Sequence, residues 1–199
     1  MKLSEYVKQD FVNDLDYYED TVGYADLSQP GWKDLGNTHL PAGMLQFVKE
    51  ISTDERKDGH NLDNVYTYGR HPDLNKWAAE TFPHVRLQDV RVQMQKPGDK
   101  VDPHVDTLFG QITKWIEEEP KLGEIEHSME NPNPNFKACR YFIAVEDHVD
   151  GQEFIINNKP WIWKSGDAIS LNVWRAIHHT KNNSEVNRYI IKVTGIETK

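Results

Sequence analysis

The sequence has a single cysteine and no long apolar run. One cysteine, Cys139, cannot form an internal disulfide, which is typical of proteins from a reducing compartment. Because Cys139 stands in an apolar run, we expect it to be buried in a strand and not to act as a nucleophile. Charges recur every few residues from Met1 onward, so the sequence predicts neither a signal peptide nor a membrane span. We therefore expect a cytoplasmic protein that does not bind membranes.

Positive charge is also scarce. The chain has 23 Lys and Arg against 32 Asp and Glu, a formal net charge of -9 at pH 7. Broad binding to a phosphate backbone depends on Lys and Arg, so nucleic acid is not an expected partner. With 199 residues and 37% hydrophobic side chains, the chain is long enough to bury the core of one globular domain, 1–199. Nothing in the sequence indicates the oligomeric state.

Helical spacing of apolar residues is confined to three segments. It predicts helices over 41–51 and over 71–80, the second capped by Asp73. A third helix is expected from Thr107 to Ile116, and the three glutamates that follow oppose its dipole, so that end should fray. The segment 107–135 is long for a connection between strands, which is typical of a lid or a binding loop.

Alternating or continuous apolar runs predict strands from residue 85 onward. The expected strands are 85–94 with a bulge at Asp89, 139–146, 152–156, 161–163, 167–174 and 188–194. Residues 1–40 carry turn signals and predict an irregular outer layer. Helices followed by many short strands favour a mostly β fold, an antiparallel sandwich or barrel with helices on one face.

Three His-X-Asp pairs stand out, because a histidine and a carboxylate two residues apart, with a distant histidine, can form the facial triad of non-haem iron sites. They are His71/Asp73, His104/Asp106 and His148/Asp150. Asp73 is better explained as a helix cap, and the third pair leaves too little chain before the next candidate histidine. His104 and Asp106 are therefore the predicted ligands; the alternative is a surface turn with incidental charges.

The distant ligand is expected in the run from Leu171 to Gly195. This run predicts two strands joined by a polar turn, with a histidine near the end of the first and Arg188 at the start of the second. His178 and His179 are neighbours on a strand and point to opposite faces, so at most one can face a metal. Parity does not decide between them. An arginine placed like Arg188 could grip a carboxylate beside the metal.

The ordered motifs resemble those of the Fe(II)- and 2-oxoglutarate-dependent oxygenases, in the aspartyl/asparaginyl and prolyl hydroxylase-like branch. They are Pro97-Gly98 leading to His104-Val-Asp106, then Trp163-Lys-Ser-Gly166-Asp167, then His178 with Asn182, Ser184 and Arg188. The last spacing is the reason to prefer His178 over His179. The resemblance spans 86–196 and implies a double-stranded β-helix (jelly roll) over that range, after a helical and irregular part, 1–85. The inserted segment 107–135 departs from the compact pattern of the family.

The resemblance also implies the cofactors and the reaction. His104, Asp106 and His178 would bind Fe(II), and 2-oxoglutarate would chelate the iron with its distal carboxylate on Arg188. The expected activity is that of a dioxygenase that uses O2, releases succinate and CO2, and hydroxylates Pro, Asn or Asp in a protein substrate, or a free amino acid.

Two residues and one alternative function stay open. Arg140 either binds a carboxylate of 2-oxoglutarate or of the substrate, or is a strand-edge arginine; Trp174 either lines the substrate pocket or belongs to the core. The alternative function is a cupin-like jelly roll that binds a metal or a small acid without redox chemistry. A non-redox binder would have no need for Arg188 as a clamp for 2-oxoglutarate.

Overall fold

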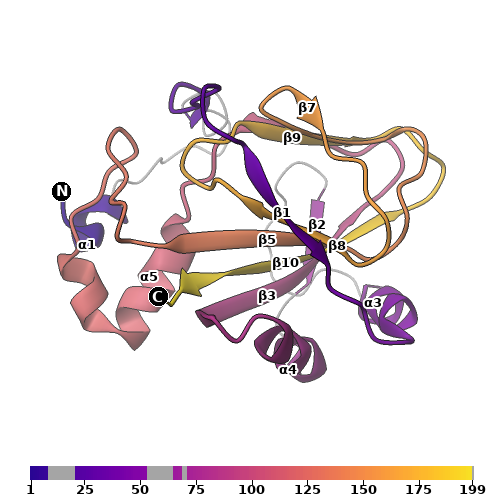
Figure 1. Ribbon diagram of the computed structural model, residues 1–199, viewed down its shortest axis with the longest axis horizontal. Coiled ribbons are helices and arrows are strands. Elements are labelled where there is room, and N and C mark those ends of the chain that lie inside the picture. The colour runs from indigo at the N-terminus through magenta and orange to yellow at the C-terminus, as the bar shows by residue number, and fades with distance from the viewer. Residues whose placement is uncertain (9–20, 53–64, 69–70, 199) are drawn as a thin grey trace.

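A computed structural model of the chain describes residues 1–8, 21–52, 65–68 and 71–198. Two antiparallel sheets face each other, with helices on the outside of the larger sheet and at one end (Figure 1). The larger sheet has the strand order β1-β8-β5-β10-β3-β2, and the smaller has the order β4-β9-β6-β7. The predicted class, a mostly β jelly roll with flanking helices, is confirmed.

The larger sheet consists of β1 (Trp32–Asn37), β2 (Val65–Tyr68), β3 (Val85–Gln95), β5 (Ala138–Ala144), β8 (Asp167–Leu171) and β10 (Arg188–Glu197). The smaller sheet consists of β4 (Lys100–His104), β6 (Gln152–Ile156), β7 (Lys159–Pro160) and β9 (His178–Asn182). The helices are α1 (Leu3–Tyr6), α3 (Met44–Ile51), α4 (Pro72–Thr81), α5 (Phe109–Glu118) and the 3₁₀ helix η1 (Pro120–Glu124). In the described part of the chain, no helix combines the length and the apolar character needed to cross a membrane.

The larger sheet is buried on both faces. Its outer face packs against α3 and α4, where Val48 and Leu74 meet Ile191 and Val193 of β10. Its inner face meets the smaller sheet in a second cluster that includes Ile190. A strand covered on both sides has no polar face, which explains why β10 is an almost continuous apolar run in the sequence.

The inner face of this sheet nevertheless carries several charged residues. In β10, the residues on the same side as Ile190 are Arg188, Lys192 and Thr194, since side chains alternate along a strand. In the neighbouring strands, Arg91 lies opposite Lys192 and Arg140 lies opposite Thr194. A polar region is therefore built into the space between the two sheets.

The segment 107–135 packs closely against α1 at one end of the sandwich (Figure 1). The Tyr6 hydroxyl donates a hydrogen bond to the Thr107 carbonyl (3.0 Å), and its ring lies 4.6 Å from that of Phe109. Trp115 of α5 donates from Nε1 to the Leu87 carbonyl in β3 (2.9 Å). The segment contributes to the core, and its role as a lid stays a prediction.

Several expected elements differ from the structure. The N-terminal region contains a strand, β1, because residues 32–37 pair with β8 although their sequence has no regular apolar alternation. Residues 161–163 form no strand; β7 is the dipeptide before them, and Trp161 and Trp163 are buried in the core instead. Predicted strand 167–174 ends at Leu171, because residues 173–175 turn.

Two local predictions also need correction. The cap of α4 is His71, whose Nδ1 accepts a hydrogen bond from the Asp73 N–H (3.3 Å), so Asp73 lies in the first turn. In β3, the left-handed residue is Leu87 (φ 53°), and the register with β10 shifts opposite it, so the irregularity precedes Asp89.

Candidate metal centre

The facing ends of β4 and β9 bring two histidines together. His104, the last residue of β4, and His178, the first of β9, are cross-strand partners, and their ring centroids lie 4.2 Å apart. His178 thus begins its strand and does not stand near the end of one, as the sequence suggested. Asp106 follows two residues after β4, with Oδ1 3.8 Å from His104 Nε2 and Oδ2 3.9 Å from His178 Nε2. The three candidate ligand atoms lie within 4.8 Å of one another.

Backbone carbonyls fix which imidazole nitrogen faces the centre. His104 Nδ1 lies 2.9 Å from the Asp102 carbonyl, and His178 Nδ1 lies 3.2 Å from the Ala176 carbonyl. A carbonyl can only accept, so each Nδ1 carries the proton and each Nε2 presents a lone pair. A hydrogen bond from the other ring nitrogen to a backbone carbonyl orients histidines that bind metals.

Burial sets the protonation states of the triad. It lowers the pKa of His178 to about 3 and also lowers the pKa of His104, so both rings are neutral near pH 7. Burial alone would raise the pKa of Asp106, but the Arg140 guanidinium and the two histidines hold it well below its usual range. Asp106 Oδ2 is buried and makes no hydrogen bond in the described structure. Two neutral nitrogens and one carboxylate fit a divalent metal such as Fe(II).

The structure distinguishes the candidate histidines and the His-X-Asp pairs. Among the described residues, His104, Asp106 and His178 form the one group with the spacing of a metal site, whereas His179 is half-buried and points to the other face of β9. His71 caps a helix, and His148 Nε2 contacts the Gln152 carbonyl (2.8 Å) within a turn. The chosen pair is therefore the one that meets His178.

Arg140 lies beside the centre and not at a strand edge. It is buried, its Nη1 forms an ion pair with Asp106 Oδ1, and its Nε donates to Thr194 Oγ1 (3.2 Å). The guanidinium therefore connects β10 to the carboxylate of the triad. Its contact with 2-oxoglutarate or a substrate stays a prediction.

Arg188 occupies an aromatic enclosure near the triad. Its guanidinium carbon lies 5.8 Å from the centre of the Phe154 ring and 5.9 Å from that of Trp163. Phe154 also borders the triad, with its ring 6.1 Å from that of His178. Nη1 donates to the Glu153 carbonyl (2.8 Å), Nε is buried without a partner, and no carboxylate among the described residues pairs with the guanidinium. Burial lowers the pKa of Arg188 to about 9. An anion bound beside the guanidinium would stabilise its charged form.

Asn182 and Ser184, which share the spacing motif with Arg188, build the turn between β9 and β10. Asn182 donates from Nδ2 to the Gln95 carbonyl (2.9 Å) and to the Val186 carbonyl (2.8 Å). The Ser184 hydroxyl donates to Asn182 Oδ1 (2.6 Å). These contacts fix the start of β10, and so they position Arg188 without touching the triad.

Trp174 lies in the core, where its ring is 4.4 Å from that of His127 and 6.2 Å from that of Phe136. This packing explains its burial without a ligand, and its role in substrate binding stays a prediction. The sequence analysis missed Lys192, a buried lysine on the inner face of β10. Its position four residues after Arg188, which places both on one face of a strand, was the signal that could have found it.

Comparison with known proteins identifies the fold of this chain but not its family. No family model and no curated protein matches this sequence. Among solved structures, the chain is similar to the non-heme alpha-ketoglutarate-dependent epimerase SnoN from nogalamycin biosynthesis, with TM-score 0.52, 11% identity, and coverage of 90% of this chain and 80% of that one. These figures show a shared fold.

Two hydroxylases show the same likeness. A prolyl-4-hydroxylase from Pseudomonas putida matches with TM-score 0.50 and 9% identity, covering 87% of this chain and 96% of that one. The viral collagen prolyl hydroxylase of Paramecium bursaria Chlorella virus-1, solved as a complex with 2OG, gives TM-score 0.50, 9% identity and coverages of 87% and 99%. The fold is therefore that of double-stranded β-helix structures, and the buried triad is present within it.

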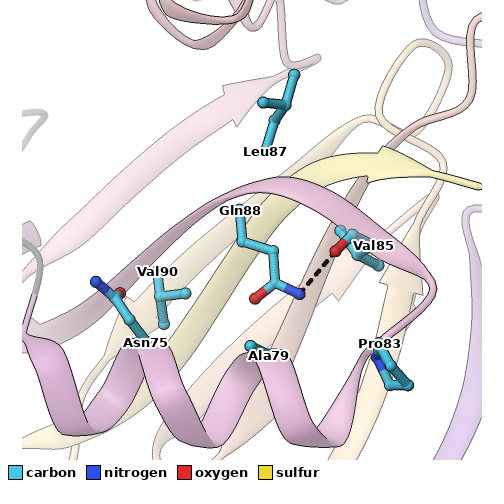
Figure 2. A pocket seen from close by; sticks show the side chains of 7 residues that line it. All are labelled: Asn75, Ala79, Pro83, Val85, Leu87, Gln88 and Val90. Atoms are coloured by element: carbon cyan, nitrogen blue, oxygen red, sulfur yellow. Dashed lines mark hydrogen bonds between the residues drawn. The ribbon is translucent and has the colours of Figure 1, made fainter. Parts of the chain in front are cut away.

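A cavity of about 460 Å³ lies away from the triad, between α4 and the outer side of β3 (Figure 2). Its lining residues are Asn75, Ala79, Pro83, Val85, Leu87, Gln88 and Val90. The Gln88 amide donates to the carbonyls of Phe82 (3.0 Å) and Val85 (2.9 Å), so it is occupied by the local backbone. The lining contains no acidic, basic or nucleophilic side chain, and the cavity offers no chemistry of its own.

Proposed function

We propose that this protein is an Fe(II)- and 2-oxoglutarate-dependent oxygenase that hydroxylates an amino acid, either free or as a Pro, Asn or Asp residue of a protein. The observation that carries the proposal is the buried convergence of His104 Nε2, His178 Nε2 and the Asp106 carboxylate, with both imidazole tautomers set by backbone carbonyls. Three ligands on one side of a metal leave positions for a cosubstrate and O2. The likeness to hydroxylase structures supports the fold of such an enzyme.

The residues of the triad would hold the metal and exclude water in this reaction. His104, Asp106 and His178 hold the metal in a site that little solvent reaches, since Asp106 is only 4% exposed and His178 only 5%. Fe(II) with bound 2-oxoglutarate supplies the activation of O2 that hydroxylation requires, with succinate and CO2 as the other products. Burial of the triad keeps competing water away from that chemistry.

Arg188 is the proposed clamp for the distal carboxylate of 2-oxoglutarate. A guanidinium offers two parallel N–H donors to a carboxylate, and the buried Nε of Arg188 has no partner in the described structure. The two surrounding rings exclude water and leave the charge to be compensated by a ligand. Phe154 borders both Arg188 and His178, which supports a clamp at this position.

The test is an anaerobic titration of metal-free protein with Fe(II) and then with 2-oxoglutarate, followed by absorption in the visible range. Chelation of an Fe(II) centre by a 2-oxo acid is expected to produce a metal-to-ligand charge-transfer band. The band should appear in the wild type and be lost in His178→Ala. His179→Ala is the matched control, because it removes the neighbouring imidazole on the other face of β9 and should leave the band unchanged.

Arg188→Met tests the clamp in the same titration. It should retain Fe(II) and weaken the affinity for 2-oxoglutarate by tenfold or more, since a buried charged hydrogen bond to the ligand is lost. Folded, iron-loaded wild-type protein that gives no band would overturn the oxygenase proposal in favour of a jelly roll that binds a metal without redox chemistry.

A further inference from the structure

Lys192 is a buried lysine on the inner face of β10. It stands in the middle of β10 and is 8% exposed. Among the residues that the structure describes, its ammonium group has neither a hydrogen bond nor an ion pair. Lysine is almost never buried without a partner, because the ammonium group must give up its hydration.

In the described part of the chain, the carboxylates near Lys192 are paired with arginines. Arg91, its cross-strand partner, is paired with Asp89 through Nε and Oδ2 (2.8 Å). Arg140 is paired with Asp106. Among the described residues, each arginine therefore pairs with a carboxylate, and Lys192 pairs with none.

Lys192 and Arg188 reach the surroundings of the triad from different positions along β10. The two cations are on the same face of β10, four residues or about 13 Å apart along the strand. Phe154 borders both Arg188 and His178, whereas Phe142, the cross-strand partner of Lys192, places its ring 6.3 Å from that of His178. Lys192 is thus near the triad but separated along β10 from the proposed clamp for 2-oxoglutarate.

The electrostatic surroundings favour an anion beside Lys192. Burial is the main cause that lowers the pKa of Lys192 to about 7, and the Arg140 guanidinium lowers it further. The Asp106 carboxylate opposes this shift but is already engaged by Arg140. A carboxylate brought by a ligand would supply the missing counter-charge.

We propose that Lys192 binds a carboxylate of the prime substrate, which makes that substrate a carboxylic acid, such as a free amino acid, and not an internal Pro or Asn residue of a protein. This assignment deepens the proposed function and rests on it, because it takes the side of the triad next to Arg188 to be the 2-oxoglutarate side. An internal Pro or Asn residue has no carboxylate to offer. A free acid that reaches between the sheets offers one and places the rest of its carbon chain beside the metal.

The experiment uses acetate as the probe and acetamide as its uncharged match. The melting temperature of protein loaded with Mn(II) and saturating 2-oxoglutarate is measured against each probe, with sodium chloride added to hold the ionic strength constant. Acetate should raise the melting temperature of the wild type, and acetamide should not. In Lys192→Met the apparent affinity for acetate should fall at least tenfold, Lys192→Arg should restore most of it, and Lys181→Met, which changes an exposed lysine of β9, should behave as wild type.

A parallel titration with 2-oxoglutarate separates the two possible sources of the carboxylate. Lys192→Met should bind 2-oxoglutarate within threefold of the wild type, whereas Arg188→Met should lose tenfold or more. If Lys192→Met also loses tenfold, the carboxylate at Lys192 belongs to 2-oxoglutarate, and the substrate assignment is wrong. An acetate response that persists in Lys192→Met also overturns it.

The same experiments distinguish failure of this proposal from failure of the oxygenase proposal. If the wild type does not bind 2-oxoglutarate, the acetate titration is repeated on protein without it. A response that still depends on Lys192 would then support the carboxylate site and contradict the oxygenase proposal.

Lys192→Met should be at least as stable as the wild type, because it removes an uncompensated buried charge. A large loss of stability would instead show that Lys192 has a structural counter-charge, which contradicts the proposal.

Discussion

Arg140 forms a buried ion pair with Asp106, the carboxylate of the triad. Asp106 therefore has two cationic partners available to it, the arginine that is present and the metal that the triad fits. The arginine keeps the carboxylate ionised in the absence of metal, which its burial would otherwise oppose. Stability and metal binding are coupled through this one side chain.

Replacement of Arg140 should expose that coupling. In Arg140→Met the metal-free protein is expected to lose about 3 kcal/mol of unfolding free energy, because a buried carboxylate is left without its partner. Mn(II) should raise the melting temperature of the variant more than that of the wild type, since the metal supplies the missing charge. Thermal unfolding with and without Mn(II) measures both effects.

Arg86→Met is the matched control for this prediction. Arg86 pairs with Glu119, but the two side chains are 36% and 43% exposed. Solvent screens such a pair, so the variant should lose no more than about 1 kcal/mol and should respond to Mn(II) as the wild type does. Equal Mn(II) responses in Arg140→Met and the wild type would show that arginine and metal do not share the carboxylate.

The turn before Arg188 offers a second prediction. Asn182 is fully buried and donates two hydrogen bonds to backbone carbonyls, one of them from β3. Asn182→Ala should cost about 2–4 kcal/mol, because it deletes both bonds and leaves buried acceptors unsatisfied. Since the turn positions β10, affinity for 2-oxoglutarate should also fall.

Asn183→Ala separates the buried amide from a general effect of the turn sequence. Asn183 is exposed, and its backbone, which the substitution retains, makes the hydrogen bond to the Gly151 carbonyl (2.7 Å). Its unfolding free energy in urea should therefore lie within about 0.5 kcal/mol of the wild type. Comparable losses in the two variants would mean that the Asn182 amide has no special role.

The site was more predictable from the sequence than the fold around it. His104 and Asp106 follow from residue type and spacing, because only a few side chains can bind a metal, and the role of Arg188 stays a prediction. Strand parity alone did not decide between His178 and His179. The spacing to Asn182, Ser184 and Arg188 favoured His178, and the register between β4 and β9 places it opposite His104. Lys192 lies in a mostly apolar strand, and its position four residues after Arg188 was the one feature that indicated it faces the space between the sheets.

The fold was predictable where a segment's pattern reflects one buried face. Strand β6 and helices α3 and α4 were found for this reason. Strand β1 has no local pattern because its pairing with β8 comes from tertiary contacts. Residues 161–163 show the alternation of a strand because Trp161 and Trp163 are buried, although their backbone makes only isolated hydrogen bonds to Phe154 and His148. Long-range context decides such segments, and local propensity does not.

Substitution of Gly195 tests the packing of the bulge between β3 and β10, and substitution of Gly110 in α5 is its control. A Cβ on Gly195 would lie 2.4 Å from Val85 Cγ1 and 2.8 Å from the Arg86 carbonyl oxygen, so Gly195→Ala must displace backbone. We expect a loss of about 2 kcal/mol or more. Gly110 in α5 has nothing within 4 Å of its would-be Cβ, so Gly110→Ala should be neutral or stabilise by up to about 1 kcal/mol. Chemical denaturation measures the unfolding free energy of both variants. A Gly195→Ala variant as stable as the wild type would mean that the bulge accommodates a methyl group without loss of packing.

The last prediction concerns His127, which joins the segment 107–135 to the core. Its ring is 2% exposed and packs on Trp174, its Nδ1 accepts from the Asn133 N–H (3.3 Å), and its Nε2 has no partner among the described residues. Burial lowers the pKa of His127 to about 4, below its ordinary value of 6.5. Between pH 4 and pH 6.5, His127 binds more protons in the unfolded chain than in the folded one. The stability that the neutral, buried ring contributes is therefore complete above pH 6.5 and declines as the pH falls towards 4.

The expected loss from His127 between pH 7.5 and pH 5.5 is about 1 kcal/mol. His127→Asn keeps an acceptor close to the position of Nδ1 but cannot take up the proton, so it should show a smaller loss over the same range. Because His104 and His178 titrate in both proteins, the difference between wild type and variant isolates His127. Urea unfolding at the two pH values measures it, and identical losses would mean that His127 is protonated without disturbing the core.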